Sequence, residues 1–303
     1  KHFMKTNKEK FDLVILEQFN SDCPVGIAYT FNAPYIALSS CAMMTYHYDR
    51  VGMPKITSYM PTLFSSHSTK MTFMERFYNW FVAHSHNFIY NMATNRGINK
   101  ILKKHLGNDM PDIQELVKKT SLIMVNQHFS LSGVKPLTPA VIEVGGIHIE
   151  ESKPLDPELQ RWLDTAHNGV ILISWGSMIR ADSLPDHKRD ALMQALKQFK
   201  QRVIWKWENG TVPNVPNNVY IRPWLPQKDI LCHPKVRVFM SHGGLLGSSE
   251  AAHCGVPMVV TPMYGDQFMN AAAVEYRGMG SIVKYTEMTT ENIVNAIKIA
   301  LEP

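Results

Sequence analysis

Three glycines and three serines follow the apolar run at 236–240, within the segment Ser241–Glu250 (SHGGLLGSSE). Glycines let a phosphate approach the backbone, and the N–H groups at a helix start attract an anion. His242 stands beside that start and can donate another hydrogen bond, so this segment is a candidate phosphate site at Gly243 and Gly244. An ordinary strand-to-helix turn with a structural histidine explains the same residues equally well.

A second candidate loop, Pro223–Gln227 (PWLPQ), follows the apolar run at 219–222. Two prolines stiffen it, the indole of Trp224 can stack on a flat base, and Gln227 can bond to base or ribose groups. The alternative is that Trp224 belongs to the hydrophobic core, which is the usual place of an isolated tryptophan.

A third candidate loop carries Asp266 and Gln267 after the apolar run at 257–260. The carboxylate and the amide offer acceptors and donors that suit sugar hydroxyls. Taken alone, the pair is better explained by Asp266 as the N-cap of a helix.

The elements that must position these loops alternate between strands and helices in the second half of the chain. Such alternation predicts a doubly wound parallel sheet, whose ligands bind at the carboxyl ends of the strands. The expected strands are 169–174, 202–207, 219–222, 236–240 and 257–260, and the expected helices are 186–199, 250–254 and 271–276.

The first half of the chain is less regular. The apolar run 11–16 (FDLVIL) predicts a central parallel strand that is buried on both faces. Further strands are expected at 33–38 and 121–125, with helices across 70–118. Aromatic and methionine residues at helical spacing within 58–92 indicate mainly core and the wall of an acceptor pocket, and membrane-surface contact is the more specific hypothesis. These residues include Phe73, Phe77, Trp80, Phe81, Phe88 and Met92.

Composition restricts the class of protein. The chain has 303 residues, 45% hydrophobic and 19% charged, with a net charge of +5, which is the profile of a packed protein of two domains. No basic run with interleaved aromatics is present, which argues against nucleic acid as a partner. The four cysteines lack zinc-site spacing, so we expect buried free thiols and no metal. No apolar run reaches the roughly 18 residues of a membrane span.

The segment 239–267 (FMSHGGLLGSSEAAHCGVPMVVTPMYGDQ) resembles the signature of the UDP-glycosyltransferases, the family that includes the UDP-glucuronosyltransferases. Upstream blocks resemble the family in the same order, namely 144–147 (VGGI), 173–177 (ISWGS) and 223–227 (PWLPQ). The likeness extends over the whole chain, and in general character the sequence resembles the insect members of the family.

This resemblance implies an α/β GT-B fold, in which two Rossmann-like doubly wound parallel-sheet domains face a cleft. It implies a partial acceptor-binding domain at 1–147, a polar linker at 148–158 with two prolines, and a UDP-sugar-binding domain at 159–303. It places Trp224 on the uracil, Gln227 and Glu250 on the uridine, and Glu250 on the ribose hydroxyls. It also places Ser177, His242, Gly243 and Gly244 on the diphosphate, and Asp266 and Gln267 on the sugar. Leu246 replaces an asparagine of many vertebrate members, and Ser248 or Ser249 is a candidate substitute.

The mechanism implied by the family is inverting and needs no metal or cofactor. A histidine takes the proton of the acceptor hydroxyl, and a carboxylate orients that histidine. Glu17, at the carboxyl end of the strand at 11–16, is the candidate carboxylate; Asp22 is the second choice, and a solvated loop carboxylate is the alternative for Glu17. His2 is too close to that strand to be the base, and the other histidines before the linker are interpreted as structural or surface residues: His47, His67, His84, His86, His105 and His128.

The expected activity is transfer of a hexose, glucose before glucuronic acid, from a UDP-sugar to a small lipophilic acceptor. The alternatives are a non-catalytic fragment that binds UDP-sugar or a lipophile, and, more distantly, a dehydrogenase, which the absence of GxGxxG disfavours. The polar start and the abrupt stop are typical of a chain cut at both ends. The family lies on the lumenal side of the endoplasmic reticulum membrane, and the sequon at Asn209 is compatible with that location.

Overall fold

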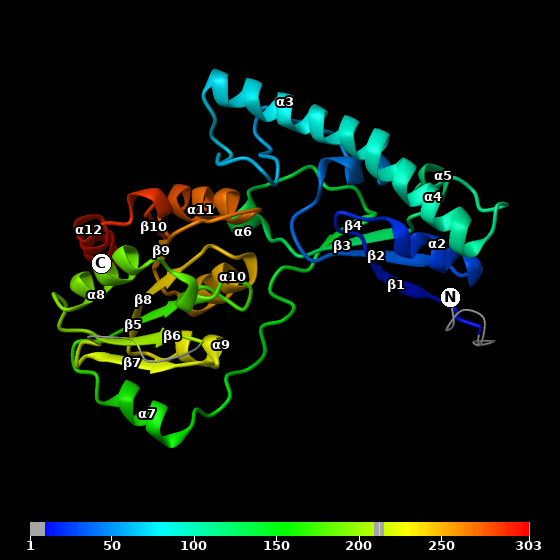
Figure 1. The fold of residues 1–303 in the computed structure, drawn as a ribbon. Helices are drawn as coiled ribbons and strands as arrows, with labels where there is room; N and C mark the ends of the chain where they lie inside the picture. Colours follow the sequence, from blue (N-terminus) through cyan, green and yellow to red (C-terminus); the bar gives the residue numbers. More distant parts are fainter. Residues whose placement is uncertain (1–9, 209–211, 213–214, 303) are drawn as a thin grey trace. The chain divides into compact units, whose positions relative to one another are not determined.

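The computed structural model describes residues 10–208, 212 and 215–302; His2 and the sequon at Asn209 lie outside them. The chain divides into two compact units (Figure 1). Unit 1 extends to Ser65 and continues from Thr69 to Gly145, and unit 2 holds Ser66–Ser68 and everything from Gly146 onward.

Unit 1 contains a four-stranded parallel sheet in the order β1-β2-β3-β4. The strands are β1 (Val14–Glu17), β2 (Tyr35–Ser39), β3 (Leu122–Val125) and β4 (Val141–Glu143). The helices are α2 (Cys23–Thr30), α3 (Phe73–Ile89), α4 (Asn95–Leu106), α5 (Ile113–Val117) and α6 (Phe129–Ser132). Two short helical segments complete the unit, the 3₁₀-helix η1 (Thr45–Arg50) and the π-helix η2 (Tyr90–Thr94).

Helix α3 begins at a capping box, in which Thr72 and Glu75 bond to each other's backbone N–H groups. Figure 1 shows that α3 runs on into α4, and the π-helix η2 fills the junction. The helical segment predicted at 70–118 is therefore three α-helices and a π-helix, with α4 and α5 separated around Pro111.

The prediction that the first strand is central and buried on both faces is wrong. Within the described residues β1 pairs only with β2, so it lies at the edge of the sheet. Leu16 is buried against α2, but Ile15 is 60% exposed and the preceding Leu13 is 46% exposed. A continuous apolar run therefore does not guarantee two covered faces.

The assignment of the aromatic stripe to the core is also wrong for α3. The face of α3 that is buried carries the small or polar residues Asn79 and Ala83. Its large apolar side chains point outward, and those at least 48% exposed are Phe73, Met74, Phe77, Tyr78, Trp80, Phe81, Phe88 and Ile89. No helix in the described part of the chain is long and apolar enough to cross a bilayer.

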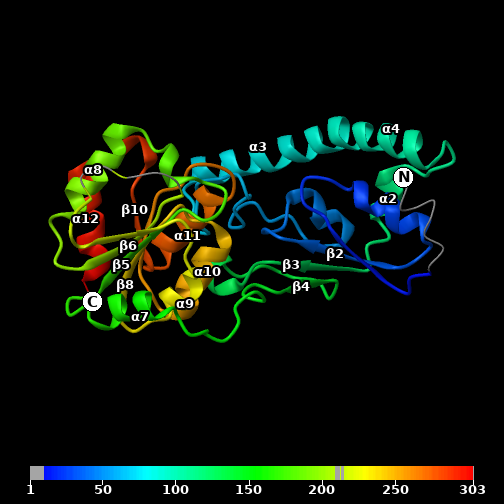
Figure 2. The same cartoon turned by 60° about the horizontal axis from the view of Figure 1, so that its bottom comes forward.

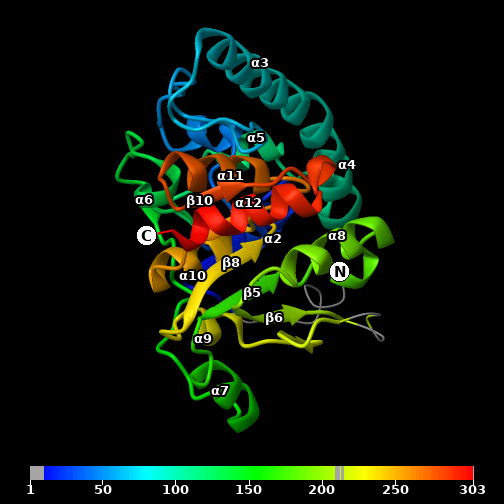
Figure 3. The same cartoon turned by 90° about the vertical axis from the view of Figure 1, so that its left-hand side faces the viewer.

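Unit 2 contains a six-stranded parallel sheet in the order β10-β9-β8-β5-β6-β7. Its strands are β5 (Val170–Ser174), β6 (Arg202–Lys206), β7 (Val219–Arg222), β8 (Val236–Ser241), β9 (Met258–Val260) and β10 (Gly280–Ile282). Figure 3 shows β8, β5 and β6 side by side. Counted along the chain this order is 6-5-4-1-2-3, which is the doubly wound arrangement that the alternating pattern predicts.

Helices cover both faces of this sheet, as Figure 2 shows for α8 and α12 on one side and α9 and α10 on the other. The helices are α7 (Pro157–Asp164), α8 (Asp186–Leu196), α9 (Gln227–Leu231), α10 (Leu245–Cys254), α11 (Gln267–Tyr276) and α12 (Thr290–Leu301). Two short 3₁₀-helices, η3 (Ala181–Ser183) and η4 (Tyr285–Glu287), lie in the connections. The central strand β5 is buried along its whole length.

The expectation of four free thiols is wrong. Cys232 and Cys254 form a disulfide that joins the residue after α9 to the last residue of α10. The sequence spacing gave no indication of this pair, because the two residues meet only when both helices pack on the same face of the sheet. Cys23 is a half-buried free thiol, and Cys41 is half-buried as well.

Candidate functional site

The candidate site lies where the strand order of unit 2 reverses, between β5 and β8. From this point the order of the parallel strands continues outward in opposite directions. This leaves a crevice at the carboxyl ends of β5 and β8, which is where doubly wound sheets bind ligands. The loop with Gly176 and Ser177 follows β5, and the loop with His242 and Gly243 follows β8. The topology therefore brings together the loops of Ser177 and His242, which the resemblance places on one diphosphate.

The ring of His242 is packed between two glycines. A Cβ on Gly176 would lie 2.9 Å from Cε1 of His242, and a Cβ on Gly244 would also collide with the ring. Gly176 additionally has a φ of +73°, which side-chain-bearing residues rarely adopt. These two positions need glycine because the imidazole occupies the space of a side chain.

Burial lowers the pKa of His242 to about 4, because the charged imidazolium loses its hydration. Without a ligand the ring is therefore neutral at physiological pH, and it can donate one hydrogen bond rather than supply a positive charge. A bound diphosphate would raise this pKa.

Helix α10 begins beside this histidine, and its first backbone N–H groups have no acceptor within the helix. Gly244 is the N-cap residue. Asn270 donates to the carbonyl oxygen of Gly243 at 2.9 Å and fixes the turn. Ser248 is buried with no partner for its Oγ among the described residues, whereas Ser249 donates to the carbonyl oxygen of Leu245. Of the two candidate serines, only Ser248 has a hydroxyl without a hydrogen-bond partner among the described residues.

Lys206, the last residue of β6, is a site residue that the sequence analysis missed. Its Nζ donates to the carbonyl oxygen of Gly176 at 3.0 Å and to Oε1 of Glu208 at 2.6 Å. It thereby holds the loop of Ser177, whose side chain is exposed. The rule that ligands gather at the carboxyl ends of strands was the signal that could have identified it.

Gln227 and Glu250 meet although 22 residues separate them. Gln227 opens α9 and donates from Nε2 to Oε2 of Glu250 on α10 at 2.7 Å. Both side chains are half-buried. A carboxylate fixed in this way retains further lone pairs for hydroxyl donors.

Trp224 is 67% exposed, so its alternative assignment to the core is wrong. The ring lies 5.5 Å from Nζ of Lys206, which places it near the loop of Ser177. An exposed indole on a loop that Pro223 and Pro226 stiffen is free to stack on a planar ligand.

Asp266 and Gln267 differ in their hydrogen-bond partners. Asp266 is the N-cap residue of α11, the position that the alternative explanation predicts, but its side chain makes no capping bond. It accepts instead from Nδ2 of Asn270 at 2.9 Å. Burial raises the pKa of Asp266. Gln267 is buried, and its Oε1 accepts from the backbone N–H groups of Met263 and Tyr264, which leaves its amide N–H₂ as the donor.

In unit 1, Glu17 ends β1 and is exposed. Its Oε1 accepts from the hydroxyl of Ser40 at 2.7 Å and from the backbone N–H of that residue at 3.2 Å. Asp22 is buried. Arg50 donates to both of its oxygens, and Tyr90 donates to Oδ2. The surroundings of Asp22 are those of a buried structural ion pair, whereas Glu17 can reach a further partner.

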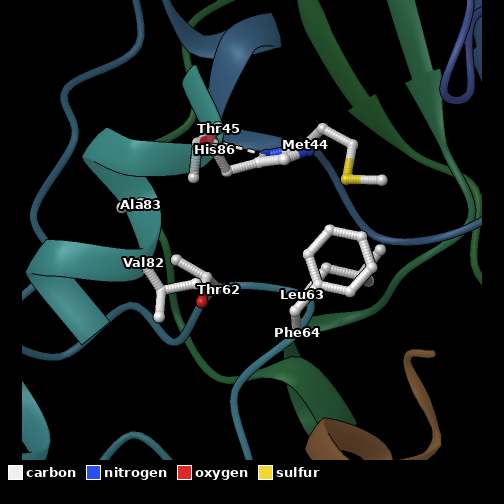
Figure 4. A pocket seen from close by; sticks show the side chains of 8 residues that line it. All are labelled: Met44, Thr45, Thr62, Leu63, Phe64, Val82, Ala83 and His86. Atoms are coloured by element: carbon white, nitrogen blue, oxygen red, sulfur yellow. Dashed lines mark hydrogen bonds between the residues drawn. The ribbon is translucent and has the colours of Figure 1, made fainter. Parts of the chain in front are cut away.

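A pocket in unit 1 lies between α3, η1 and the segment 62–64 (Figure 4). Its lining is Met44, Thr45, Thr62, Leu63, Phe64, Val82, Ala83 and His86. The lining is mainly apolar, and Nδ1 of His86 lies 3.5 Å from the hydroxyl of Thr45. Across the described residues, no three His, Cys, Asp or Glu side chains come together as metal ligands.

Comparison with known proteins agrees with this geometry. The family model described as UDP-glucoronosyl and UDP-glucosyl transferase matches residues 1–303. UDP-glucosyltransferase 2 of Dactylopius coccus is 39% identical over 292 residues, which are 96% of this chain and 56% of that protein. Human UDP-glucuronosyltransferase 1A1 is 30% identical over 295 residues, which are 97% of this chain and 54% of that protein. The chain thus spans about half the length of these relatives.

Solved structures show the same fold. A UDP-glucosyltransferase from Polygonum tinctorium that can glucosylate indoxyl matches with a TM-score of 0.64 and 18% identity, over 99% of this chain and 69% of that one. The glycotransferase of kitacinnamycin matches with a TM-score of 0.62 and 18% identity, over 96% and 68%. These likenesses confirm the predicted α/β fold of GT-B type. From the family match and the identity to its members, the chain belongs to the UDP-glycosyltransferase family.

Proposed function

We propose that the chain binds a UDP-sugar in unit 2 and takes part in transferring the hexose to a hydroxyl of a small lipophilic acceptor. The observation that carries this proposal is the convergence of His242, the Gln227–Glu250 pair and the exposed Trp224 around one sheet edge. Together they offer hydrogen-bond donors to a diphosphate, an acceptor to a ribose and a stacking surface to a base.

The proposed reaction is an inverting displacement without a metal or cofactor. The acceptor oxygen bonds to the anomeric carbon and its proton passes to a histidine base. The bond from that carbon to the diphosphate oxygen breaks, and UDP leaves with the electron pair. The N–H groups at the start of α10 and neutral His242 stabilise the charge that develops on the leaving oxygen.

Calorimetric titration with UDP tests the donor site. We expect saturable binding that Trp224→Ala and His242→Ala weaken. Trp80→Ala is the matched control, because Trp80 is also an exposed tryptophan but lies in unit 1. Absence of UDP binding by the intact chain would refute the proposal.

For the sugar we propose glucose, with glucuronic acid second. The relative from Dactylopius coccus is named a glucosyltransferase and is more similar than the human glucuronosyltransferase. Titration with UDP-glucose and UDP-glucuronic acid is expected to give tighter binding of the first. The reverse order would assign glucuronic acid to the site.

We propose further that none of the histidines of this chain is the catalytic base. The chain alone therefore binds the donor but transfers little sugar. The burial of His47 supports this, because its completely buried ring is out of reach of an acceptor. If the chain transfers no sugar at all, the alternative of a non-catalytic binding fragment applies. Robust glycoside formation by the isolated chain, measured by mass spectrometry, would contradict it.

We also propose a lumenal location at the endoplasmic reticulum membrane. The disulfide Cys232–Cys254 supports an oxidising compartment, and the outward aromatic face of α3 supports contact with a lipid surface. Alkylation of free thiols in cells, followed by mass spectrometry, is expected to leave both cysteines unmodified. Labelling of either one would count against the lumen.

A further inference from the structure

The carboxylate of Glu250 has a second neighbour besides Gln227. Its Oε1 lies 3.6 Å from Nε2 of His148, within unit 2. His148 lies in the segment 148–156, which precedes α7 and which the sequence suggested to be a plain polar linker. The connecting segment therefore reaches the carboxylate that the family resemblance assigns to the ribose.

The imidazole of His148 has unused hydrogen-bonding capacity. Both ring nitrogens are buried, and neither makes a hydrogen bond within the described part of the chain. Buried polar atoms are bonded in nearly all proteins, so such a pair needs an explanation. A movement of roughly 0.5 Å would bring the nitrogen within hydrogen-bond range of Glu250.

The segment that carries His148 is anchored on α9. The backbone N–H of Lys153 donates to Oδ1 of Asp229 at 3.0 Å. Lys228 donates to the carbonyl oxygen of Glu150 at 2.9 Å and pairs with Asp229. Lys228 and Asp229 follow Gln227 in the same helix, so one helix holds both neighbours of Glu250.

The carboxylate can serve all of these partners and a ribose together. An ionised carboxylate has about four lone-pair positions. Gln227 takes one and His148 would take a second, which leaves two for the 2′- and 3′-hydroxyls. Held from both sides, the carboxylate cannot rotate away from the diol.

We propose that His148 is a positioning residue that fixes Glu250 for the ribose diol, so that the connecting segment enables the site to distinguish UDP from 2′-deoxy-UDP. The inference rests on the proposed UDP site. It extends the donor site to a residue that precedes the unit's first strand.

The test is titration of the 303-residue chain with UDP and with 2′-deoxy-UDP. His148→Ala is expected to weaken UDP binding roughly tenfold, as for a lost bond to a charged group, and to weaken the binding of 2′-deoxy-UDP less, because that nucleotide keeps only the 3′-hydroxyl. His148→Asn, which keeps a donor, is expected to restore part of the preference. His233→Ala is the matched control, because His233 also lies beside a carboxylate, 3.1 Å from Asp164.

A double-mutant cycle with Glu250→Gln isolates the coupling. In that background His148→Ala is expected to have no further effect on UDP binding. Equal weakening of both nucleotides by His148→Ala, or additive effects in the cycle, would overturn the inference while leaving the UDP site intact. Absence of UDP binding by the unmodified chain, or binding that Trp224→Ala does not weaken, would overturn both.

Discussion

Three histidines lie where burial disfavours the imidazolium. Burial lowers the pKa of His242 to about 4, lowers that of His47 well below its usual value, and lowers that of His86. The unfolded chain binds protons on these side chains near pH 6.5, whereas the folded chain does so only at lower pH. The free energy of unfolding must therefore fall as the pH falls below about 6.5, by about 1.4 kcal/mol for each unit by which a pKa is lowered.

His47→Leu tests this linkage at a single residue. The variant removes one proton-binding group, so we expect a shallower loss of stability between about pH 7 and 5 than in the unmodified chain. Urea unfolding at a series of pH values measures it, with the exposed His187→Leu as control. A slope identical to that of the unmodified chain would contradict the assignment.

Glu17→Gln tests the proposed orienting carboxylate. In a full-length enzyme that supplies the base, we expect turnover to fall by roughly 10²–10⁴, the usual contribution of general-base catalysis, because the histidine loses its partner. The binding of UDP is expected to stay unchanged, since Glu17 lies in unit 1. Asp22→Asn is the comparison: it breaks the buried pair with Arg50, so we expect it to lower stability. Unchanged turnover in Glu17→Gln would remove that residue from the mechanism.

At this scale the sequence could name candidates where a motif lay after a strand. His242 and Gln227 were selected in this way and Glu250 through the family resemblance, and the structure brings Gln227 and Glu250 together. Lys206 lay near the end of a predicted strand and could have been found by that rule. His148 could not, because its importance depends on contacts made from the connecting segment. No local pattern encodes such contacts.

At the scale of elements, α9 and α10 are joined twice. Gln227 bonds to Glu250 near one end of α9, and the disulfide Cys232–Cys254 ties the other end. The pair of helices therefore behaves as one support for the proposed uridine site.

Cys232→Ser combined with Cys254→Ser is expected to lower the free energy of unfolding by about 3 kcal/mol, which the chain-entropy model gives for a loop of this length. We also expect weaker UDP binding, because α9 is only five residues long and loses its anchor. Urea unfolding and calorimetry measure the two effects, with Cys23→Ser as control. Full retention of stability would show that helix packing alone holds the pair.

The exposed aromatic face of α3 predicts contact with a membrane surface. Phe77→Asp combined with Phe81→Asp places two charges on its exposed aromatic face, so we expect loss of sedimentation with phosphatidylcholine vesicles. Phe129→Asp, also at an exposed phenylalanine but on α6, is the control. Equal vesicle binding by all three proteins, or by none, would argue against a lipid surface as the partner of α3.

The elements that the sequence predicted have the predicted type, whereas β4, β10, α7 and α9 were not predicted, and the environment of the elements was harder to predict. The apolar runs of β5 and β1 look alike in sequence, yet only β5 lies between two other strands. Likewise, helical spacing identified α3 but could not say which face is covered, because that depends on the rest of unit 1. Periodicity encodes the element, and only the assembled fold decides what covers it.

At the scale of the whole molecule, each unit has hydrophobic cores of its own. The described residues proposed to bind UDP all belong to unit 2. A fragment of residues 146–303 is therefore expected to fold and to bind UDP with the affinity of the complete chain. Circular dichroism and calorimetry check this. A folded fragment without UDP affinity would show that residues before Gly146 complete the donor site.

The outer edge of β1 has a consequence for handling the protein. Along that edge the described residues place no strand, and the flanking side chains of Leu13 and Ile15 are exposed. Backbone N–H and C=O groups in such a position are a template for pairing with the same edge of another molecule. Concentrated samples should therefore form dimers by strand addition, detectable by sedimentation velocity, and a lysine in place of Ile15 should keep them monodisperse.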